Sequence, residues 1–206
     1  MKSISSRVDW TRQRRVLAVA LEVFARHGFG KTSMDDVARA ADISRQGLYL
    51  YFANKEALFR AAVRQELDTA LAEAFGCLDQ EAAALDQRVV GALDAWLGRY
   101  VGSMLAADIS GLLRNPSVQI EDMVDAAIDA FDARLAAAVA AATAEADRQR
   151  LGVTPEEIAA ALHVVGQGAR YLSSARGESR AAFVARLTPA VRLILADLGT
   201  TTEATP

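Results

Sequence analysis

Arg45 and Gln46 are neighbouring residues whose side chains can recognise nucleic-acid bases. An arginine guanidinium can donate two hydrogen bonds to O6 and N7 of guanine, and a glutamine amide can pair in a similar way with N6 and N7 of adenine. Both residues follow Ser44, whose type favours the start of a helix, so both should lie in the first turn of a helix. The alternative for either side chain is contact with phosphate or solvent alone.

Groups suited to phosphate contacts flank this pair. Hydroxyl and ammonium groups donate hydrogen bonds to phosphate oxygens, and Thr32, Ser33 and Lys55 supply them at the two edges of the segment. Lys55 follows Asn54 at an expected helix start, where free backbone N–H groups can meet the same phosphate. Gly47 would let the backbone approach a duplex closely, although glycine inside a helix costs about 0.5–1 kcal/mol relative to alanine.

Two short helices with a tight turn between them are expected to position these groups. Ser33 and Asp36 have the spacing of a capping box, and apolar residues then recur at helical spacing as far as Ala41. Asp42-Ile43 interrupts that period before Ser44 begins the second helix. The pattern predicts a helix-turn-helix arrangement, in which the second helix presents its first residues to the major groove.

A helix from about residue 10 to residue 26 should complete a three-helix core with this pair. It carries one apolar stripe, and Gly28 stands where a helix stop is expected. The apolar residues expected in the core are Leu17, Ala20, Leu21, Phe24, Val37, Ala41, Leu48 and Phe52. Residues 1–9 are interpreted as a mobile basic arm, with an ordinary frayed terminus as the alternative.

The same segment matches a known family pattern. The residues that carry the match are Val16-Leu17, Ala20-Leu21, Phe24, Gly28, Thr32-Ser33, Val37-Ala38, Ala41, Ile43-Ser44, Leu48-Tyr49, Tyr51-Phe52, Lys55-Glu56 and Leu58. On these residues the segment 11–60, under a third of the chain, resembles the DNA-binding domain of the TetR family of tetracycline-repressor-type bacterial regulators. Gln46-Gly47 departs from the family pattern, which usually has Gly followed by a small residue there. The resemblance implies that Tyr49 and Tyr51 face the DNA, with a place in the core as the alternative for one of them.

The distribution of charge agrees with a DNA-contacting N-terminal part. The whole chain has a formal net charge of −3. Residues 1–60 nevertheless carry 11 Lys and Arg against 6 Asp and Glu, a charge of +5, whereas the remainder carries 12 against 20, a charge of −8. Affinity for a phosphate backbone depends on cations close to it and not on the sum over the chain.

The rest of the chain has the apolar spacing of further helices. These are expected over about 54–78, 86–105, 118–148, 154–172 and 183–198. Pro189 should kink the last helix or mark a restart, and Gly199 should stop it. The predicted fold is all-α, with about nine helices in total. It has a helix-turn-helix DNA-binding domain over 1–53, a larger helical ligand-binding and dimerisation domain over 54–199, and a disordered tail over 200–206.

By the resemblance, the helical body would hold an apolar cavity for a small molecule, and the last two helices would pair with their copies in a homodimer. Aromatic or polar side chains on otherwise apolar helices are the candidate cavity wall, with core or interface packing as the alternative. The candidate ligand-binding residues are Trp96, Tyr100, Met104, Phe131, His163, Gln167 and Tyr171. Few of them are cationic, which favours a neutral or hydrophobic effector, although Arg99 and Arg170 leave an anionic one open.

Signatures of several other protein classes are missing from the sequence. There is no glycine-rich phosphate loop and no G-x-S-x-G or H-E-x-x-H motif, which argues against an enzyme. Cys77, His27 and His163 are isolated, so no zinc-ligand spacing exists. Acidic residues at 122, 125, 129 and 132 form a stripe away from the apolar one, which favours a solvated face over a metal site. We expect no catalytic residues, no metal and no cofactor.

The resemblance and the basic N-terminal part together predict a ligand-responsive transcriptional regulator. The simplest form is a repressor that a small molecule releases from a palindromic operator on double-stranded DNA. No apolar run approaches the roughly 18 residues of a membrane span, and the first residues lack a signal-peptide core, so a cytoplasmic protein without membrane contact is expected. The alternatives are a helical DNA-binding protein without an effector and a helical-bundle enzyme.

Overall fold

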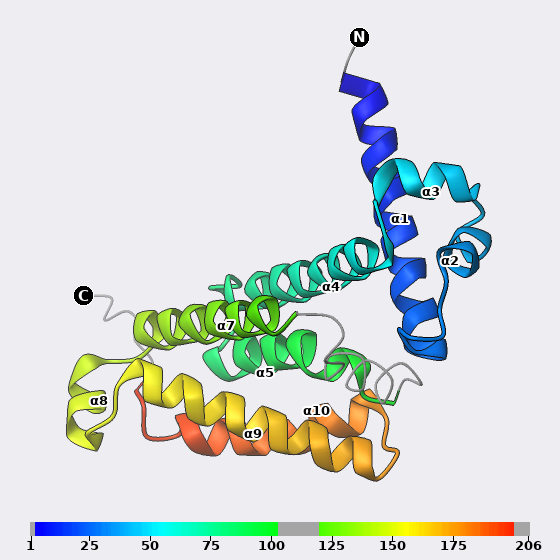
Figure 1. The fold of residues 1–206 in the computed structure, drawn as a ribbon. Coiled ribbons are helices and arrows are strands. Elements are labelled where there is room, and N and C mark those ends of the chain that lie inside the picture. Colours follow the sequence, from blue (N-terminus) through cyan, green and yellow to red (C-terminus); the bar gives the residue numbers. More distant parts are fainter. Residues whose placement is uncertain (1–2, 103–119, 200–206) are drawn as a thin grey trace. The chain divides into compact units, whose positions relative to one another are not determined.

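The structure, a computed structural model, describes residues 3–102 and 120–199 of the chain (Figure 1). This part contains nine α-helices and one short 3-10 helix: α1 Ser3–His27, α2 Met34–Ala40, α3 Arg45–Tyr51, α4 Lys55–Leu78, α5 Leu85–Trp96, η1 Gly98–Tyr100, α7 Glu121–Ala142, α8 Glu145–Leu151, α9 Pro155–Ala175 and α10 Arg180–Leu195. The all-α prediction is confirmed. The described helices form two compact units, one of residues 3–69 with 120–124 and one of residues 70–102 with 125–199.

The core of the first unit brings α2, α3 and the start of α4 together with α1 (Figure 1). Phe24 is fully buried, with its ring centroid 5.7 Å from that of Phe29 and 5.1 Å from that of Phe59. Aromatic rings at such distances add to the stabilisation that burial provides. Every residue that the sequence predicted for the three-helix core is buried, so this core is confirmed.

Capping residues fix both short helices of the first unit. Ser33 and Asp36 form the predicted capping box at the start of α2, and their hydrogen bonds lower the pKa of Asp36. Asp42, with φ of 54°, turns the chain between α2 and α3. Ser44 then caps α3 by accepting a hydrogen bond from the backbone N–H of Gly47 at 3.0 Å. These local interactions set the position at which α3 begins.

The ends of α1 differ in how well the sequence predicted them. The helix begins at Ser3 and not near residue 10, so the backbone of residues 3–9, expected as an arm, is helical. The other end is as predicted, because Gly28 adopts φ of +79° and its N–H donates to the carbonyl of Phe24 at 2.8 Å.

In the second unit, the pattern predicted as one helix over 118–148 is divided into α7 and α8. The guanidinium of Arg148 donates to the hydroxyl of Thr143 at 2.6 Å and also to the Thr143 carbonyl, which satisfies groups at the end of α7. The N–H of Ala144 donates to the carbonyl of Gly199 at 3.1 Å. Both contacts compete with continued helix, so the prediction of a single helix is wrong.

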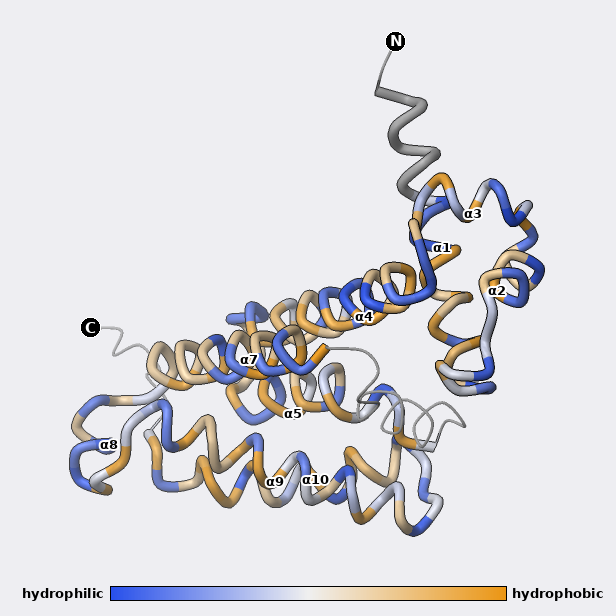
Figure 2. Tube along the Cα trace, viewed as in Figure 1, coloured by the Kyte–Doolittle hydropathy of each residue, from blue (hydrophilic) through white to orange (hydrophobic). Residues whose placement is uncertain are grey.

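α9 and α10 lie side by side and are amphipathic, with polar and apolar residues interleaved along each (Figure 2). The helix expected from about residue 154 begins with a capping box formed by Thr154 and Glu157, and Pro155 is its first helical residue. α10 continues through Pro189, so of the two alternatives for this residue, a kink or a restart, the restart is excluded. The helix ends at Leu195, before Gly199.

The small residue Gly166 on α9 serves packing inside the second unit. A Cβ added there would lie 2.8 Å from Cδ1 of Leu97 and 3.1 Å from Cδ2 of Leu93, so a larger residue would have to displace these two leucine side chains. Gly168, in contrast, has no atom within 4 Å of the corresponding position. Among residues 3–102 and 120–199, no helix has the length and apolar character needed to cross a membrane.

Candidate nucleic-acid interface

The helix α3 has one buried side and one side that faces away from the core. At about 100° per residue, positions 45, 46, 49 and 50 occupy an arc of roughly 140°, and positions 47, 48, 51 and 52 occupy the opposite arc. Leu48 is fully buried, whereas Arg45, Gln46, Tyr49 and Leu50 are exposed. We call these four residues the outward arc of α3. The arc contains both side chains predicted to read bases.

Arg45 is held on the outward arc by two neighbours. Its Nη1 donates to Oδ2 of Asp35 on α2 at 3.0 Å, and its guanidinium carbon lies 5.6 Å from the centroid of the Tyr49 ring. Both partners of the ion pair are well exposed, so solvent screens their attraction and it contributes little stability. The contacts orient the guanidinium and leave most of its donors able to meet a duplex.

Two residues predicted to donate to phosphate use their hydroxyl groups within the protein. Thr32 is only 3% exposed, and its hydroxyl donates to the carbonyl of Gly28 at 2.9 Å. The Ser33 hydroxyl donates to Oδ2 of Asp36 at 2.6 Å as part of the capping box. Both side chains therefore stabilise the start of α2, and in this conformation neither hydroxyl is directed at a phosphate.

Lys55, the third predicted phosphate donor, links the start of α4 to the turn before α2. Its ammonium donates to the carbonyl of Phe29 at 2.9 Å and lies 4.5 Å from the centroid of the Phe29 ring. A lysine ammonium has three donors, so two remain for other partners. A role in phosphate binding stays a prediction, and the observed contacts give Lys55 a structural role as well.

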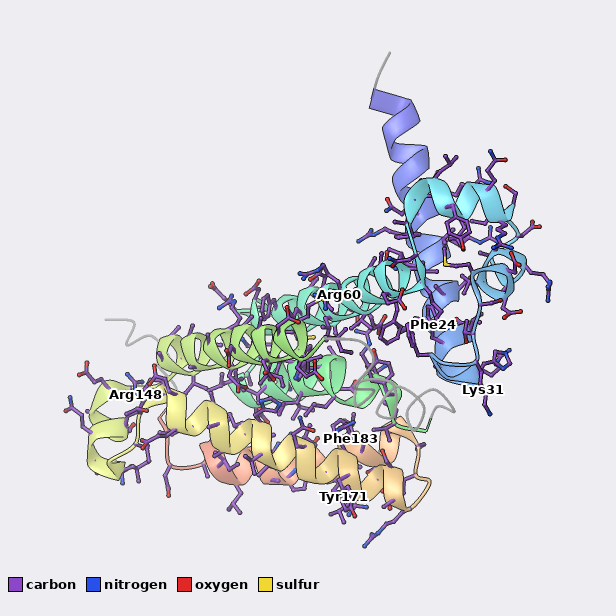
Figure 3. All side chains as sticks on the ribbon, in the orientation of Figure 1. Phe24, Lys31, Arg60, Arg148, Tyr171 and Phe183 are labelled. Atoms are coloured by element: carbon purple, nitrogen blue, oxygen red, sulfur yellow. The ribbon has the colours of Figure 1, made fainter. Side chains whose placement is uncertain are left out.

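Lys55→Ala is therefore expected to lower the free energy of unfolding by about 1–3 kcal/mol, because a hydrogen bond from a charged donor is lost. Urea unfolding monitored by circular dichroism measures this change. Lys31→Ala, at an exposed lysine in the same turn (Figure 3), is the matched control and should change stability by less than about 0.5 kcal/mol. Equal stability of the two variants would contradict the structural role.

Gly47 and Tyr51 complete the predicted set, and both lie on the inward arc of α3. A Cβ added at Gly47 would come 3.1 Å from Oγ of the capping residue Ser44, so the glycine leaves room for the cap itself. Tyr51 is partly buried, and its ring centroid lies 6.3 Å from that of Phe52. Of the two tyrosines, Tyr49 is therefore the one directed outward.

The first unit also has three exposed residues, cationic or apolar, that the sequence prediction did not include. They are Lys31 in the turn before α2, Arg39 on α2 and Leu50 on α3. The two cations could have been found from the excess of basic residues in this part of the chain. Leu50 could not, because a leucine at helical spacing is ordinarily assigned to the core.

Four of the seven predicted ligand-binding residues come together in the second unit. The ring of Phe131 stacks on Trp96 at 5.4 Å and meets His163 edge-on, also at 5.4 Å. His163 Nδ1 lies 2.5 Å from Oδ1 of Asp132, and Gln167 Nε2 lies 3.3 Å from His163 Nε2. Trp96 Nε1 is buried and has no hydrogen-bond partner among residues 3–102 and 120–199. We call Trp96, Phe131, His163 and Gln167 the body cluster.

The remaining ligand candidates are not part of this cluster. Tyr171 projects outward from α9 and is 72% exposed (Figure 3). Tyr100, in η1, is half-buried, with the Arg99 guanidinium carbon 5.8 Å from its ring centroid. Met104 lies outside the described residues. An open hollow of about 290 Å³ between α5 and α10 is lined instead by Asp86, Gln87, Val90, Gly91, Asp94, Val184, Thr188 and Arg192.

The acidic stripe on α7 is only partly a solvated face. Asp125 and Asp129 are exposed, and Asp122 is exposed beside Arg60, with 3.6 Å between the charged atoms. Asp132 is partly exposed, and its carboxylate contacts the buried His163. Within residues 3–102 and 120–199, no group of three or more acidic, histidine or cysteine side chains could hold a metal ion.

Comparison with known proteins places the N-terminal segment in a family. Residues 16–62 match the family model described as bacterial regulatory proteins, tetR family. The HTH-type transcriptional regulator RutR from Escherichia coli is 39% identical over 67 residues, which cover 32% of this chain and 32% of RutR. The sequence match therefore spans about a third of the curated relative.

Solved structures extend the similarity over the whole fold. A TetR-like transcriptional regulator from Rhodococcus sp. RHA1 is 25% identical, with a TM-score of 0.62 over 90% of this chain and 96% of that one. The transcriptional regulator FadR from Bacillus subtilis, in complex with stearoyl-CoA, has a TM-score of 0.66 over 90% of this chain and 98% of its own, and its 12% identity indicates a shared fold alone. Together with the helix-turn-helix segment, these similarities confirm the predicted family. Residues 16–62 belong to the TetR family of bacterial regulatory proteins, and the described fold is similar to that of solved TetR-like regulators.

Proposed function

We propose that this protein is a transcriptional repressor that binds a palindromic operator as a homodimer and is released from it by a small molecule. The observation that carries the DNA-binding part is the outward arc of α3. It places Arg45 and Gln46 on the side opposite the buried Leu48, where a duplex could reach them. Regulators of this architecture insert such a helix in the major groove, with base contacts from its first residues.

Exposed apolar side chains on α9 and α10 support the proposed homodimer. Val164 is 70% exposed and Leu193 is 79% exposed, and Tyr171 and Leu172 are exposed on α9 as well. Contiguous exposed apolar side chains rimmed by polar ones are typical of protein interfaces. A second copy of the same two helices would bury these side chains. The resulting dimer would carry two helix-turn-helix domains, which would read two half-sites.

The proposed effector is a neutral or hydrophobic molecule that binds in the helical body. The body cluster supports this choice, because it combines two apolar rings with a buried indole N–H that has no acceptor in the described part of the chain. The stearoyl-CoA complex of FadR is an example of a ligand bound by a protein of this fold. Since coupling between two sites is reciprocal, effector and operator would weaken one another by the same factor.

A DNA-binding protein without an effector remains the second candidate. The packing of Trp96 and His163 against Phe131 favours it, since packed rings alone would make a solid core. A helical-bundle enzyme has less support, because RutR, the Rhodococcus protein and FadR are all described as transcriptional regulators. The domain limits 1–53 and 54–199 are part of the proposal.

Selection of bound sequences from random duplex DNA by the full-length protein tests the proposed function. A repressor of this kind should enrich a palindromic site, and its affinity for that site should fall as salt concentration rises. Enrichment of no sequence, or binding that does not depend on salt, would contradict DNA recognition by this protein.

A further inference from the structure

We propose that Leu50 reads the 5-methyl group of a thymine in the operator, which makes it a base-selective residue beside Arg45 and Gln46. The proposal rests on the proposed function, because it concerns the same face of α3. It goes further by naming a base that the operator must contain and the chemical group by which that base is recognised.

The position of Leu50 on α3 is the first observation. Leu50 is 81% exposed, whereas Leu48, two residues earlier on the same short helix, is fully buried. α3 therefore uses one leucine for the core and directs the other away from it. Leu50 follows Gln46 by four residues, and side chains at this spacing are neighbours on a helix surface.

The chemistry of the duplex supplies a partner for such a side chain. In the major groove, thymine is the base that presents an apolar group, its 5-methyl, and apolar side chains contact it there. A leucine side chain has no hydrogen-bond donor, so it cannot bind the phosphate oxygens of the DNA backbone. Burying it against a methyl group removes apolar surface of both partners from water.

Single exposed leucines are common on protein surfaces, so exposure alone decides little. What distinguishes Leu50 is its surroundings, which are those of a groove-binding face and not of a protein interface. Its companions on the outward arc are Arg45, Gln46 and Tyr49, and Arg45 is already paired with Asp35. The outward arc thus has one apolar side chain among polar and cationic ones. The major-groove edge of a base sequence that contains thymine is similar, with one methyl group among polar atoms.

The spacing between Gln46 and Leu50 limits where the thymine lies. Four residues of α-helix rise about 6 Å, and successive base pairs of a duplex are about 3.4 Å apart. The two side chains should therefore reach bases within one or two steps of each other. If Gln46 pairs with an adenine, the half-site will contain adenine and thymine close together.

Replacement of thymine by deoxyuridine tests this contact, because it removes the methyl group and leaves base pairing intact. The duplex is the site selected with the full-length protein, and each thymine is replaced in turn, symmetrically in both half-sites. We expect one position at which the wild-type protein loses about three- to fivefold in affinity per half-site, the effect of removing one buried methyl group. Leu50→Ala should bind the thymine and deoxyuridine duplexes equally well, and Leu50→Met, which keeps an apolar side chain, should retain part of the difference.

The outcomes separate this proposal from the one on which it rests. Leu50 does not read thymine if the wild-type protein binds its selected site and every deoxyuridine duplex with the same affinity. The same conclusion follows if the deoxyuridine replacement lowers the affinity of Leu50→Ala as much as that of the wild type. DNA recognition would then still stand. If no selected site exists at all, both proposals fail.

Discussion

Replacing Val164 and Leu193 together by aspartate is expected to give a monomeric protein that binds its operator roughly 10²–10⁴-fold more weakly than the wild type. Both side chains are directed outward, at 70% and 79% exposure, from the helices proposed to pair with their copies. An unpaired carboxylate at an apolar interface costs far more than it does in water, so association should be lost while each chain stays folded.

The loss of affinity follows because a monomer has only one DNA-binding domain. When one DNA-binding domain of a dimer is bound, the other is held near its half-site at a high effective concentration. Light scattering should return twice the 22.0 kDa mass of the chain for the wild type and the single mass for the double variant. Leu151→Asp, at an exposed leucine on α8, is the control and should remain dimeric. A wild-type protein of monomer mass at micromolar concentration would contradict the dimer.

Leu48→Ala is expected to lower the free energy of unfolding by about 2–5 kcal/mol, because it leaves a cavity in a fully buried site. Leu50→Ala changes the same residue type on the same helix at a position 81% exposed, and should change stability by less than about 0.5 kcal/mol. Urea unfolding followed by circular dichroism compares the two directly.

The two variants also separate folding from DNA binding. Leu48→Ala should weaken binding to every duplex, because fewer molecules keep α3 in place. Leu50→Ala should bind with normal stability and lose affinity only for sites that contain its thymine. Equal stability of the two variants would show that α3 is not packed as described.

Local sequence signals predicted the helix starts well. The pairs Ser33 with Asp36 and Thr154 with Glu157 form capping boxes in the structure, and α4 runs unbroken from Lys55 to Leu78 as expected. Such signals act over three or four residues, so the sequence displays them directly. The buried faces of the first three helices were predicted for the same reason, because helical periodicity depends on near neighbours.

The errors arose where polar groups of the protein pair with one another in ways that residue type and apolar periodicity do not reveal. α7 ends at Ala142 because Arg148 and the carbonyl of Gly199 bind groups around Thr143 and Ala144. Neither partner is visible in the apolar period that suggested one long helix. A side chain five residues further along the chain and a backbone carbonyl near its C-terminal end set this boundary.

The same cause explains the candidate phosphate donors. Residue type made Thr32 and Lys55 suitable for phosphate, but the carbonyls of Gly28 and Phe29 are close enough to accept their hydrogen bonds. A polar side chain satisfied inside the protein cannot be recognised from its type alone. Leu50 shows the reverse case, since an apolar type suggests the core and only the structure shows that it faces outward.

Recognition of bases by the outward arc of α3 is tested most directly by the base preference of Arg45→Ala. The measurement is the ratio of affinities for the selected operator and for a duplex with one guanine replaced, at fixed salt, for the wild type, for Arg45→Ala and for Arg64→Ala, an exposed arginine on α4. We expect the wild type and Arg64→Ala to keep the same ratio, and Arg45→Ala to lose about 1–3 kcal/mol of discrimination at one guanine of each half-site. An Arg45→Ala variant that discriminates at every position as well as the wild type would contradict base reading by this face.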